Sequence, residues 1–328
     1  MNSIRRAVID VGTNSVKLLV ADVQGGNARP VVEESLQTRL GKNFYETHRL
    51  QPDAIAHTAG AVADYAKVAR EKHATSIRVV ATSAARDAVN QNELVSAIEK
   101  ASDLKVEIIS GEQEAEWAFQ GATSSRDFAN TPLLLLDVGG GSSEFIVGHG
   151  GHKSYARSFP IGTVRLMEKF PHADPPTRDE FAKCRDWIEK FLREQMRPEL
   201  EPVLQREKNS GEIQLAGTGG TATILARMKL KSDHYDRERI EATRLSLKQV
   251  RKYLESLWSL PLAQRRELPG LPKSRADVIL PGVLIYASVM EQFGFAELRV
   301  STRGLRFAAV IASETPAALH LAPLFNVW

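Results

Sequence analysis

The stretch LLLLDVGGGSSEFIVG, residues 133–148, decides the fold expected of this chain. It opens with a continuous apolar run, residues 133–136, of the length and composition that fill a buried strand. The run ends at Asp137, and the three glycines at 139–141 can take the positive φ angles of a tight turn. Because these glycines have no Cβ, backbone N–H groups there can approach an anion closely. A second apolar segment resumes at Phe145, so the stretch predicts two strands joined by a phosphate-binding loop.

The same pattern occurs a second time, in RAVIDVGTNSVKLLVADV at residues 6–23. The two stretches align with Asp10 on Asp137, Val11 on Val138, Gly12 on Gly139, Ser15 on Ser142 and Val20 on Val147. Each copy then reaches a Gly-Gly pair, at 25–26 and 150–151, followed by a strand-like segment at 30–35 and 153–159. A repeat of this kind indicates a duplicated architecture. We therefore predict two three-stranded meanders, each opening with an Asp-tipped phosphate loop.

The acidic residue at the strand end points to a metal. Asp137 would project beside phosphate oxygens, and a carboxylate is stable there mainly when a divalent cation lies between the two groups. Magnesium prefers a few carboxylates together with waters and substrate phosphates. The pattern therefore predicts Mg²⁺ as the cofactor, with Mn²⁺ as the alternative metal.

The composition is that of an ordinary globular protein of about two domains, with 328 residues, 43% of them hydrophobic and 25% charged. The formal charge of +3 suits an anionic substrate but is too small to indicate nucleic-acid binding. No dense run of Lys and Arg stands out. No specific nucleic-acid partner is therefore expected.

Cysteine usage and hydropathy indicate where the protein works. Cys184 is the single cysteine, so no intrachain disulfide and no thiolate metal site can form. A reducing cytoplasm is the economical location for such a chain. The N-terminus has no signal-type apolar core, and the longest apolar stretch, at about 278–290, contains Pro281 and is too short to span a bilayer. We expect a cytoplasmic protein without a membrane partner.

The segment between the two meanders places a carboxylate where ligands bind. It predicts helices at about 52–72 and 92–101, strands at 77–81 and 106–110, and a small-residue loop, TSAARDAVN, at 82–90. The loop carries Arg86. Ser110 and Gln113 form an S-x-x-Q capping box, which puts Glu114 in the first turn of a helix at a strand end. Ligands of open α/β sheets bind at such strand ends.

The polar residues 123–131 mark the domain boundary. In the second domain the sequence predicts a helix that begins at a Thr177/Glu180 capping box, followed by a strand, a glycine turn and a helix at 212–228. It then predicts a helix capped by Ser246 and Gln249, a helix at 274–293 that bends at Pro281, a strand at 297–301 and a helix from Gly304. Within this domain, Gly217, Gly219 and Ala222 fit G-x-G-x-x-A, but no ribose-binding acid follows. A third anion-facing or nucleotide-facing turn is therefore favoured over a dinucleotide site. The tail from Glu314 packs back on the first domain or mediates self-association.

Six motifs give the chain a family resemblance over nearly its whole length. They are VIDVGTNSVKLLV, ATSAARDAVN, IISGEQEAEWAF, LLDVGGGSSEF, FPIGTVRL and AGTGGTATILA, in this order. With them the chain resembles the exopolyphosphatase / guanosine pentaphosphate phosphatase (Ppx/GppA) family, a branch of the acetate kinase, sugar kinase, Hsp70 and actin superfamily. The TSAARDA and ISGEQEA stretches select this branch over the kinases.

The resemblance implies an α/β protein with a duplicated ribonuclease-H-like, actin-like fold, in which two lobes enclose an active-site cleft. The lobes would comprise residues 1–125 and 126–303, followed by a helix and tail at 304–328. The implied activity is metal-dependent hydrolysis of the terminal phosphoanhydride of inorganic polyphosphate or guanosine pentaphosphate, releasing orthophosphate. Guanosine and adenosine polyphosphates are the nucleotide partners to consider, and a homodimer is one assembly to test.

Carried over by position, the resemblance assigns a role to each matching residue. Glu114 would be the catalytic acid that orients and activates the attacking water, while Ser83 and Arg86 would face the terminal phosphoryl group. Asp137 and Glu144 would anchor magnesium through waters, and Asp10 on the opposing loop would share that role. The implied phosphate-binding residues are Gly12, Thr13, Asn14, Ser15, Ser83, Arg86, Gly139, Gly140, Gly141 and Ser142.

Two features depart from the family pattern. Longer members carry C-terminal domains, including an HD-type helical domain, whereas this sequence ends at Trp328 and has no His-Asp dipeptide. The short two-domain form is therefore expected. In VSTRGLRFA, residues 300–308, Phe307 stands where the family commonly has Glu, and the acid that commonly precedes Gly-Leu-Arg is missing.

Plainer alternatives remain beside these assignments. Glu114 could merely favour the positive end of a helix dipole, and Arg86 could be a solvated loop arginine, although a bidentate guanidinium suits a phosphate clamp. Lys17 and Arg165 stay open. A superfamily kinase using ATP, or a nucleotide-binding scaffold without turnover, would use the same cleft. The carboxylates argue against the scaffold, and the preferred phosphoanhydride substrate stays open.

Overall fold

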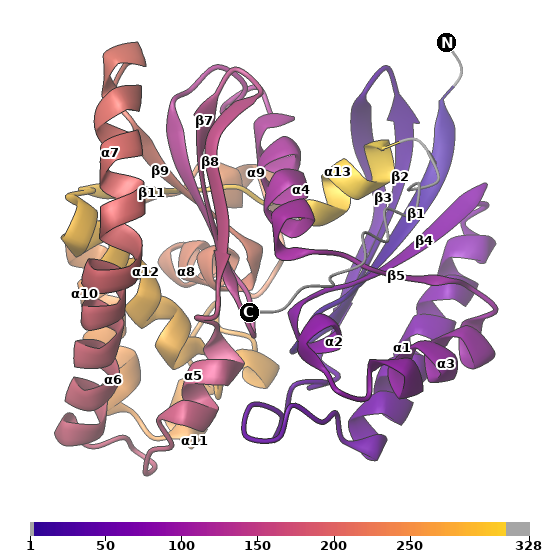
Figure 1. The fold of residues 1–328 in the computed structure, drawn as a ribbon, viewed down its shortest axis with the longest axis horizontal. Helices are drawn as coiled ribbons and strands as arrows, with labels where there is room; N and C mark the ends of the chain where they lie inside the picture. The colour runs from indigo at the N-terminus through magenta and orange to yellow at the C-terminus, as the bar shows by residue number, and fades with distance from the viewer. Residues whose placement is uncertain (1–2, 313–328) are drawn as a thin grey trace, which may run out of the picture.

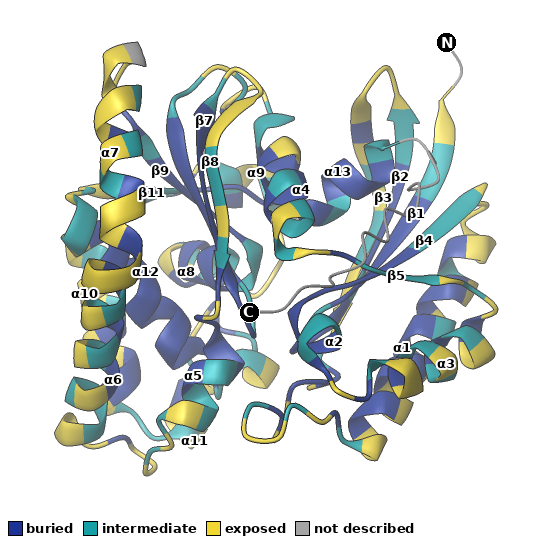
Figure 2. Cartoon of the chain, viewed as in Figure 1, coloured by how far each residue is buried: buried dark blue, intermediate teal, exposed yellow. Residues whose placement is uncertain are grey.

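The structure is a computed structural model, and it describes residues 3–312 of the chain. Two mixed sheets lie side by side, each with helices packed around it, so the molecule has two lobes (Figure 1). Buried residues form the centres of both sheets and the inward faces of the helices, while exposed residues cover the outer helices (Figure 2). The predicted α/β fold with two lobes is confirmed.

The first lobe is built on a five-stranded sheet in the order β3-β2-β1-β4-β5. Its elements are β1 (Ile4–Val11), β2 (Val16–Gln24), β3 (Asn27–Leu36), α1 (Pro52–Glu71), β4 (Ser76–Ala81), α2 (Ser83–Asp87), α3 (Gln91–Ser102) and β5 (Val106–Ile108), followed by α4 (Gly111–Thr123). The strands β1, β2 and β3 are antiparallel neighbours, whereas β4 pairs parallel with both β1 and β5. Parallel pairing requires crossover connections, which α1 and α3 supply.

The second lobe repeats this order as β8-β7-β6-β9-β11 and adds β10 as an antiparallel edge strand. Its strands are β6 (Leu133–Val138), β7 (Ser143–His149), β8 (His152–Phe159), β9 (Gln214–Thr218), β10 (Arg244–Ser246) and β11 (Glu297–Val300). The helices that follow β8 along the chain are α5 (Thr163–Lys169), α6 (Arg178–Phe191), α7 (Arg197–Glu207), α8 (Gly219–Leu230), α9 (Arg237–Glu241), α10 (Leu247–Ser259), α11 (Leu262–Arg265), α12 (Ile279–Phe293) and α13 (Leu305–Ile311). A π-helical turn (Leu192–Met196) joins α6 to α7, and 3₁₀ turns occupy Lys208–Ser210 and Lys273–Arg275. The capping boxes predicted at Thr177 and Ser246 are both present.

The two meanders match in their turns and in their irregularities. The Gly25–Gly26 pair has φ angles of 56° and 80°, and the Gly150–Gly151 pair has 56° and 78°. Two consecutive positive φ angles favour glycine and give the tight turn that joins twisted antiparallel strands. The strand register shifts once in each meander, at the Val20/Ala21 step and at the aligned Val147/Gly148 step. The internal repeat predicted from the sequence is therefore confirmed.

The central strands bring both phosphate loops to the carboxyl edge of their sheets. In the first sheet Asp10 of β1 pairs with Val80 of the parallel strand β4. In the second sheet Asp137 of β6 pairs with Thr218 of the parallel strand β9. Open α/β sheets bind their ligands outside this edge.

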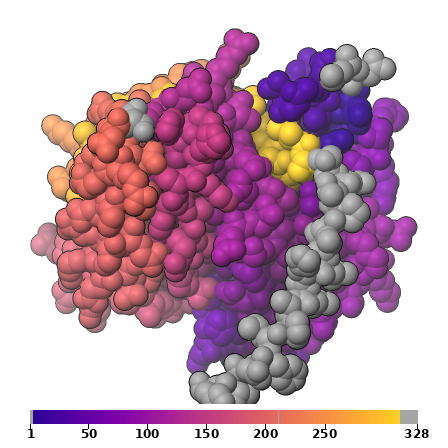
Figure 3. Space-filling view, turned by 45° about the horizontal axis from the view of Figure 1, so that its top comes forward, coloured from indigo at the N-terminus to yellow at the C-terminus, as the bar shows by residue number. Residues whose placement is uncertain are grey.

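Two helices connect the lobes. Helix α4 follows the first sheet in sequence, yet Phe119 packs with Leu135 and Ile146 of the second sheet. Helix α13 comes after the second sheet, yet it packs on α4 and on β1, β2 and β3. Trp117 of α4 and Phe307 of α13 share one hydrophobic cluster. Figure 3 shows α13, in yellow, seated at the junction of the two lobes.

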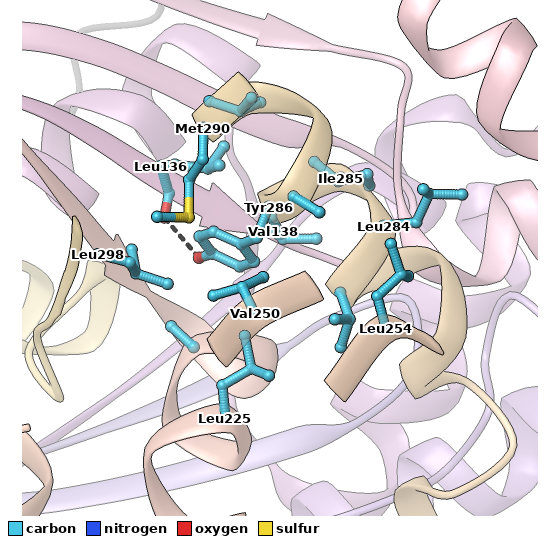
Figure 4. Close-up of a cluster of buried hydrophobic side chains, with 14 of the residues drawn as sticks. Leu136, Val138, Leu225, Val250, Leu254, Leu284, Ile285, Tyr286, Met290 and Leu298 are labelled. Atoms are coloured by element: carbon cyan, nitrogen blue, oxygen red, sulfur yellow. Dashed lines mark hydrogen bonds between the residues drawn. The ribbon is translucent and has the colours of Figure 1, made fainter. Parts of the chain in front are cut away.

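The larger core lies in the second lobe, with Tyr286 of α12 among its buried residues. Figure 4 shows this side chain beside Leu136, Val138 and Met290. The Tyr286 hydroxyl donates to the backbone carbonyl of Leu136 at 2.9 Å, and the carbonyl of Thr218 lies 3.2 Å away. These carbonyls belong to β6 and β9 next to Asp137, so the hydroxyl fixes both strand ends.

Two local expectations differ from the structure. Residues 83–87, expected within a loop, form the short helix α2. The helix expected at 274–293 begins at Ile279, so Pro281 lies in its first turn and does not bend it. Proline is tolerated in a first turn because the N–H groups there have no intrahelical partner.

The altered VSTRGLRFA motif is a packing feature. Phe307 is fully buried, and the guanidinium carbons of Arg237 and Arg303 lie 4.9 and 5.0 Å from its ring centroid. The tail expected from Glu314 lies outside the described residues. The domain limits 1–125, 126–303 and 304–328 stay a prediction. No helix within residues 3–312 is long and apolar enough to cross a membrane.

Tyr286→Phe should lower the free energy of unfolding by about 1 to 2 kcal/mol, because the buried hydrogen bond to the Leu136 carbonyl is lost. Tyr253→Phe is the matched control, since Tyr253 packs on the same core and its hydroxyl makes no hydrogen bond to any residue of the described range. Urea denaturation measures both variants. Wild-type stability in Tyr286→Phe would contradict the role given to this hydroxyl.

Candidate active site

A cavity of about 100 Å³ lies where the two phosphate loops face each other. The residues singled out in the sequence that line it are Asp10, Gly12, Thr13, Asn14, Ser15, Ser83, Glu114, Asp137, Gly139, Gly140, Gly141, Ser142 and Glu144. Arg86 is held beside this lining through a hydrogen bond to Glu114. The structure thus brings together residues from both repeats and from the segment between them. Their roles as ligands or catalysts stay predictions.

The two loops have the same backbone turn. The N–H of Gly12 donates to the Ser15 carbonyl at 3.0 Å, and the N–H of Gly139 donates to the Ser142 carbonyl at 3.0 Å. The Thr13 carbonyl accepts from the N–H of Gly41 at 2.7 Å. The Gly139 and Gly140 carbonyls likewise accept from backbone N–H groups at the start of α5. Carbonyl oxygens that would repel a phosphate are therefore occupied by protein donors.

Several polar side chains around the loops are buried without a hydrogen-bond partner among the described residues. They are the hydroxyls of Thr13, Ser15, Tyr45 and Ser83 and the amide nitrogen of Asn14. Buried polar groups in native proteins are nearly always paired, so a cluster of unpaired donors indicates a missing acceptor. Phosphate oxygens are acceptors of this kind. Tyr45 was not found from the sequence, because it belongs to no motif and reaches the loops only through tertiary packing.

Glu114 lies at the start of α4, where the Ser110 hydroxyl accepts from the N–H of Gln113 at 3.1 Å. Its Oε2 accepts a hydrogen bond from Arg86 Nη1 at 3.2 Å. The same nitrogen donates to the Ile109 carbonyl at 2.9 Å, which fixes the guanidinium. Burial raises the pKa of Glu114 to about 7, with Arg86 opposing and Asp10 adding to the rise. A carboxyl with this pKa exchanges a proton readily near neutral pH.

Burial also raises the pKa values of Asp137 and Glu144, the two carboxylates predicted to anchor a metal. The Oε1 of Glu144 accepts from the Ser158 hydroxyl at 2.8 Å. Burial, together with Glu114 and Asp137, raises the pKa of Glu144 well above its ordinary value. Burial likewise raises the pKa of Asp137, which Lys17 lowers and Asp10 raises. These acids repel one another, so a cation in the cavity would stabilise their ionised forms.

The carboxylates around the cavity suit a metal that is bound through water molecules. Within residues 3–312 no group of three Asp, Glu, His or Cys side chains converges closely enough to hold an ion directly. Magnesium commonly keeps several waters and uses only one or two carboxylates together with substrate phosphates. Asp10, Asp137 and Glu144 around one cavity therefore suit a water-mediated site rather than a closed protein cage.

The cations near the cavity divide into two groups. Lys17, left open by the sequence, lines the cavity with its Nζ 3.7 Å from Asp10 Oδ2. Arg165, also left open, is not part of the cavity lining, and its Nε donates to the Gly141 carbonyl of the second loop at 2.8 Å. Arg275 lines the cavity as well, and among the described residues no carboxylate lies within ion-pairing distance of it. It was missed because it follows the predicted motifs in a short 3₁₀ turn and carries no spacing signal.

The strand–turn–helix at 212–228 faces the same cleft. Gly220 and Thr221, in the first turn of α8, line the cavity between the loops. An adjoining cavity of about 350 Å³ extends past Asp137 and includes Gly219, Arg227 and Tyr235 in its lining. The two cavities share Asp10, Lys17, Asp137, Gly220, Ile224, Arg275 and Leu305. The two cavities therefore adjoin each other along these residues.

These features define a class: an α/β protein with two lobes of repeated topology, in which a glycine loop from each lobe faces one cavity. The model of the Ppx/GppA phosphatase family matches residues 19–315. The chain belongs to the Ppx/GppA phosphatase family.

Similar proteins agree with this assignment. Exopolyphosphatase 2 of Mycobacterium tuberculosis is 36% identical over 317 residues, which cover 90% of this chain and 94% of the relative. The solved structure of the Aquifex aeolicus Ppx/GppA enzyme is 30% identical, with a TM-score of 0.75 over 95% of this chain and 100% of that one. An exopolyphosphatase from Cytophaga hutchinsonii has a TM-score of 0.81 at 26% identity, covering 93% and 96%. The predicted fold and family are confirmed.

The pKa of Glu114 predicts a pH-dependent effect on stability. The folded value of about 7 lies above the ordinary value of 4.5, so folding favours the protonated form. The resulting stabilisation is complete below pH 4.5 and is lost as the pH rises through about 7. Glu114→Gln cannot ionise, so its free energy of unfolding should exceed that of the wild type by at most about 3 kcal/mol at pH 8, and by little at pH 4.5.

Urea denaturation in EDTA at several pH values measures this difference. Glu112→Gln is the control, because Glu112 is exposed on the same helical turn. A difference between Glu114→Gln and the wild type that does not change with pH would contradict a carboxyl whose pKa is raised to about 7 in the folded protein.

Proposed function

We propose that the protein hydrolyses the terminal phosphoanhydride of inorganic polyphosphate, of guanosine pentaphosphate, or of both, and releases orthophosphate. The observation that carries this proposal is the set of unpaired buried donors around the two loops, placed in one cavity with the Glu114 carboxyl. The donors suit a phosphate group, and the carboxyl suits an attacking water. The names of the relatives, exopolyphosphatases among them, support the same reaction class.

In the proposed mechanism, the terminal phosphate lies between the loops at Gly12–Ser15 and Gly139–Ser142. Glu114 accepts a hydrogen bond from a water and orients it in line with the bridging oxygen that leaves. Phosphoryl transfer through a loose transition state needs positioned water and fixed donors more than a strong nucleophile. Arg86 holds the Glu114 carboxyl and adds positive charge beside the phosphoryl oxygens.

Asp137, Glu144 and Asp10 would hold Mg²⁺, or Mn²⁺, through water molecules. Bound there, the ion would neutralise charge between these carboxylates and the substrate phosphates. The raised pKa values of Asp137 and Glu144 support this role, because burial dominates both shifts and Lys17 offsets only part of the shift at Asp137. Lys17 offsets part of the charge of Asp10.

The adjoining cavity of about 350 Å³ supports nucleotide substrates beside inorganic polyphosphate. Gly219 and Gly220 at the start of α8 place backbone groups at the border of the two cavities. The same cavity is also compatible with the kinase alternative, because the nucleoside of ATP could occupy it. A kinase and a hydrolase differ in the acceptor of the phosphoryl group, and an assay can separate them.

A phosphate-release panel with Mg²⁺ tests the proposal on tripolyphosphate, long polyphosphate, guanosine pentaphosphate and ATP. Wild-type protein should release orthophosphate from at least one of the first three, and EDTA should stop the reaction. Asp137→Asn should keep the fold but lower turnover by orders of magnitude, because the anchor for the metal is neutralised.

Transfer of labelled phosphate from ATP to an organic acceptor, without release from the other substrates, would establish the kinase alternative. Nucleotide binding without turnover would establish the scaffold. Unchanged magnesium dependence in Asp137→Asn would refute the metal assignment.

Glu114→Gln should lower single-turnover phosphate release by roughly 10²–10⁴-fold, the usual range for general acid–base catalysis. Substrate affinity should hold or improve, because a negative charge near the phosphates is removed. Equilibrium binding measured in parallel separates the two effects, and Glu112→Gln again serves as the control. Release near the wild-type rate would move the role to another carboxylate, whereas lost binding with normal chemistry would make Glu114 structural.

A further inference from the structure

Tyr45 lies in the loop that follows β3, and its hydroxyl reaches the phosphate loop of the opposite lobe. A Cβ placed on Gly141 would collide with the Tyr45 hydroxyl, with the Ser83 hydroxyl and with Thr13 Oγ1. None of these three oxygens has a hydrogen-bond partner of normal geometry among the described residues. Three buried hydroxyls therefore converge where Gly141 has no side chain.

The ring of Tyr45 is held by the second lobe. The guanidinium carbon of Arg165, on α5, lies 4.1 Å from the ring centroid, which is a cation–π contact. Arg165 Nε also donates to the Gly141 carbonyl at 2.8 Å, and its Nη2 donates to Asp87 Oδ2 at 2.9 Å. One side chain thus connects Tyr45, the second phosphate loop and the helix that carries Arg86.

The backbone of Tyr45 is held by the same helix. Glu168, one turn after Arg165 on α5, accepts from the N–H of Tyr45 with Oε2 at 2.9 Å. The same oxygen accepts from the N–H of Phe44 at 3.2 Å. Hydrogen bonds that backbone N–H groups donate to a charged carboxylate are stronger than hydrogen bonds between neutral groups. Ring and backbone are therefore both fixed from the second lobe.

The hydroxyl of Tyr45 is suited to donate. Burial raises the pKa of Tyr45 to about 12, with Arg165 and the Thr13 hydroxyl opposing, so the phenol keeps its proton at neutral pH. Of the two hydroxyls that converge with it, Thr13 Oγ1 is the one that lowers the pKa of Tyr45 through a side-chain hydrogen bond. The Thr13 carbonyl is bonded to the N–H of Gly41, and its side chain packs closely against Gly140 of the opposite loop. The threonine is thus fixed between the two lobes.

We propose that Tyr45 is a positioning residue for the terminal-phosphate site: its hydroxyl donates to Thr13 Oγ1, and Thr13 donates its own proton to a substrate phosphate oxygen. A hydroxyl that accepts a hydrogen bond directs its proton elsewhere, and a chain of hydrogen bonds strengthens each member. The inference rests on the phosphohydrolase function proposed above and adds a residue that none of the phosphate-binding motifs contains.

A double-mutant cycle tests the relay, because coupled residues give non-additive effects. The four proteins are the wild type, Tyr45→Phe, Thr13→Val and the double variant, and the assay is phosphate release from tripolyphosphate. Each single variant removes one hydrogen bond from a series that ends on a charged phosphate. Each should therefore lower kcat/KM about tenfold. The double variant should be no slower than Thr13→Val, because Tyr45 acts through Thr13.

Tyr253→Phe is the control, since it removes a tyrosine hydroxyl far from the loops and should leave kcat/KM unchanged. Two outcomes would overturn the relay: wild-type kcat/KM in Tyr45→Phe, or a double variant slower than either single variant by the product of their effects. The multiplied effect would mean that Tyr45 acts independently of Thr13. Unfolding by urea checks that Tyr45→Phe keeps its stability, so that a structural loss is recognised.

Arg165→Lys tests the part played by the second lobe. Lysine keeps the charge but lacks the planar group that covers the ring and bonds in two directions. The variant should lower kcat/KM, and Tyr45→Phe should add little in its background. A full effect of Tyr45→Phe in Arg165→Lys would show that Arg165 does not position the tyrosine.

Failure of the proposed function has a different signature. If the wild type releases no phosphate from any phosphoanhydride, the hydrolase proposal falls, and the cycle is repeated on the dissociation constant for tripolyphosphate with Mg²⁺. Weaker binding in Tyr45→Phe that disappears in the Thr13→Val background would still support the relay. Unchanged binding in Tyr45→Phe would end it.

Discussion

Four acidic side chains, Asp10, Glu114, Asp137 and Glu144, line one small cavity at the junction of the two lobes. Removing charged carboxylates from water is costly unless cations or donors compensate. The protein supplies partial compensation through Lys17, Arg86 and Ser158, and the remaining imbalance appears as raised pKa values. We therefore propose that the cavity binds a ligand that brings both positive charge and hydrogen-bond acceptors. A metal with a phosphate chain fits both demands.

The duplicated fold explains how several carboxylates come to line one cavity. Each repeat places an acidic strand end beside a glycine loop, and the lobes face each other so that both ends meet. Glu114 comes from neither repeat but from α4, whose apolar face packs on the second sheet while Trp117 packs with α13. Glu114, the proposed catalytic acid, thus lies on a helix that contacts both lobes. Arg165 and Glu168 on α5 add a second connection, through Tyr45, on the far side of the phosphate loop.

Short-range patterns in the sequence predicted much of this fold. The glycine pairs, the Asp-tipped loops and the Ser110 cap are short-range features, so the meanders, the repeat and the place of Glu114 could be predicted. Tyr45, Arg165 and Arg275 could not be placed, because their contacts join segments far apart in the chain. The predicted bend of α12 at Pro281 was wrong, because the sequence does not distinguish a proline in the first turn of a helix from a proline at a bend. Family resemblance supplied the roles of Ser83 and Glu144, which spacing alone would not reveal.

We propose that the acidic cavity binds a phosphate chain more tightly together with a divalent cation than alone. Calorimetric titration of tripolyphosphate into Glu114→Gln protein, which should bind without turning over, measures this directly. We predict that Mg²⁺ tightens binding by at least about tenfold, because the ion offsets repulsion between the substrate and Asp10, Asp137 and Glu144. Equal affinity with Mg²⁺ and with EDTA would contradict the account.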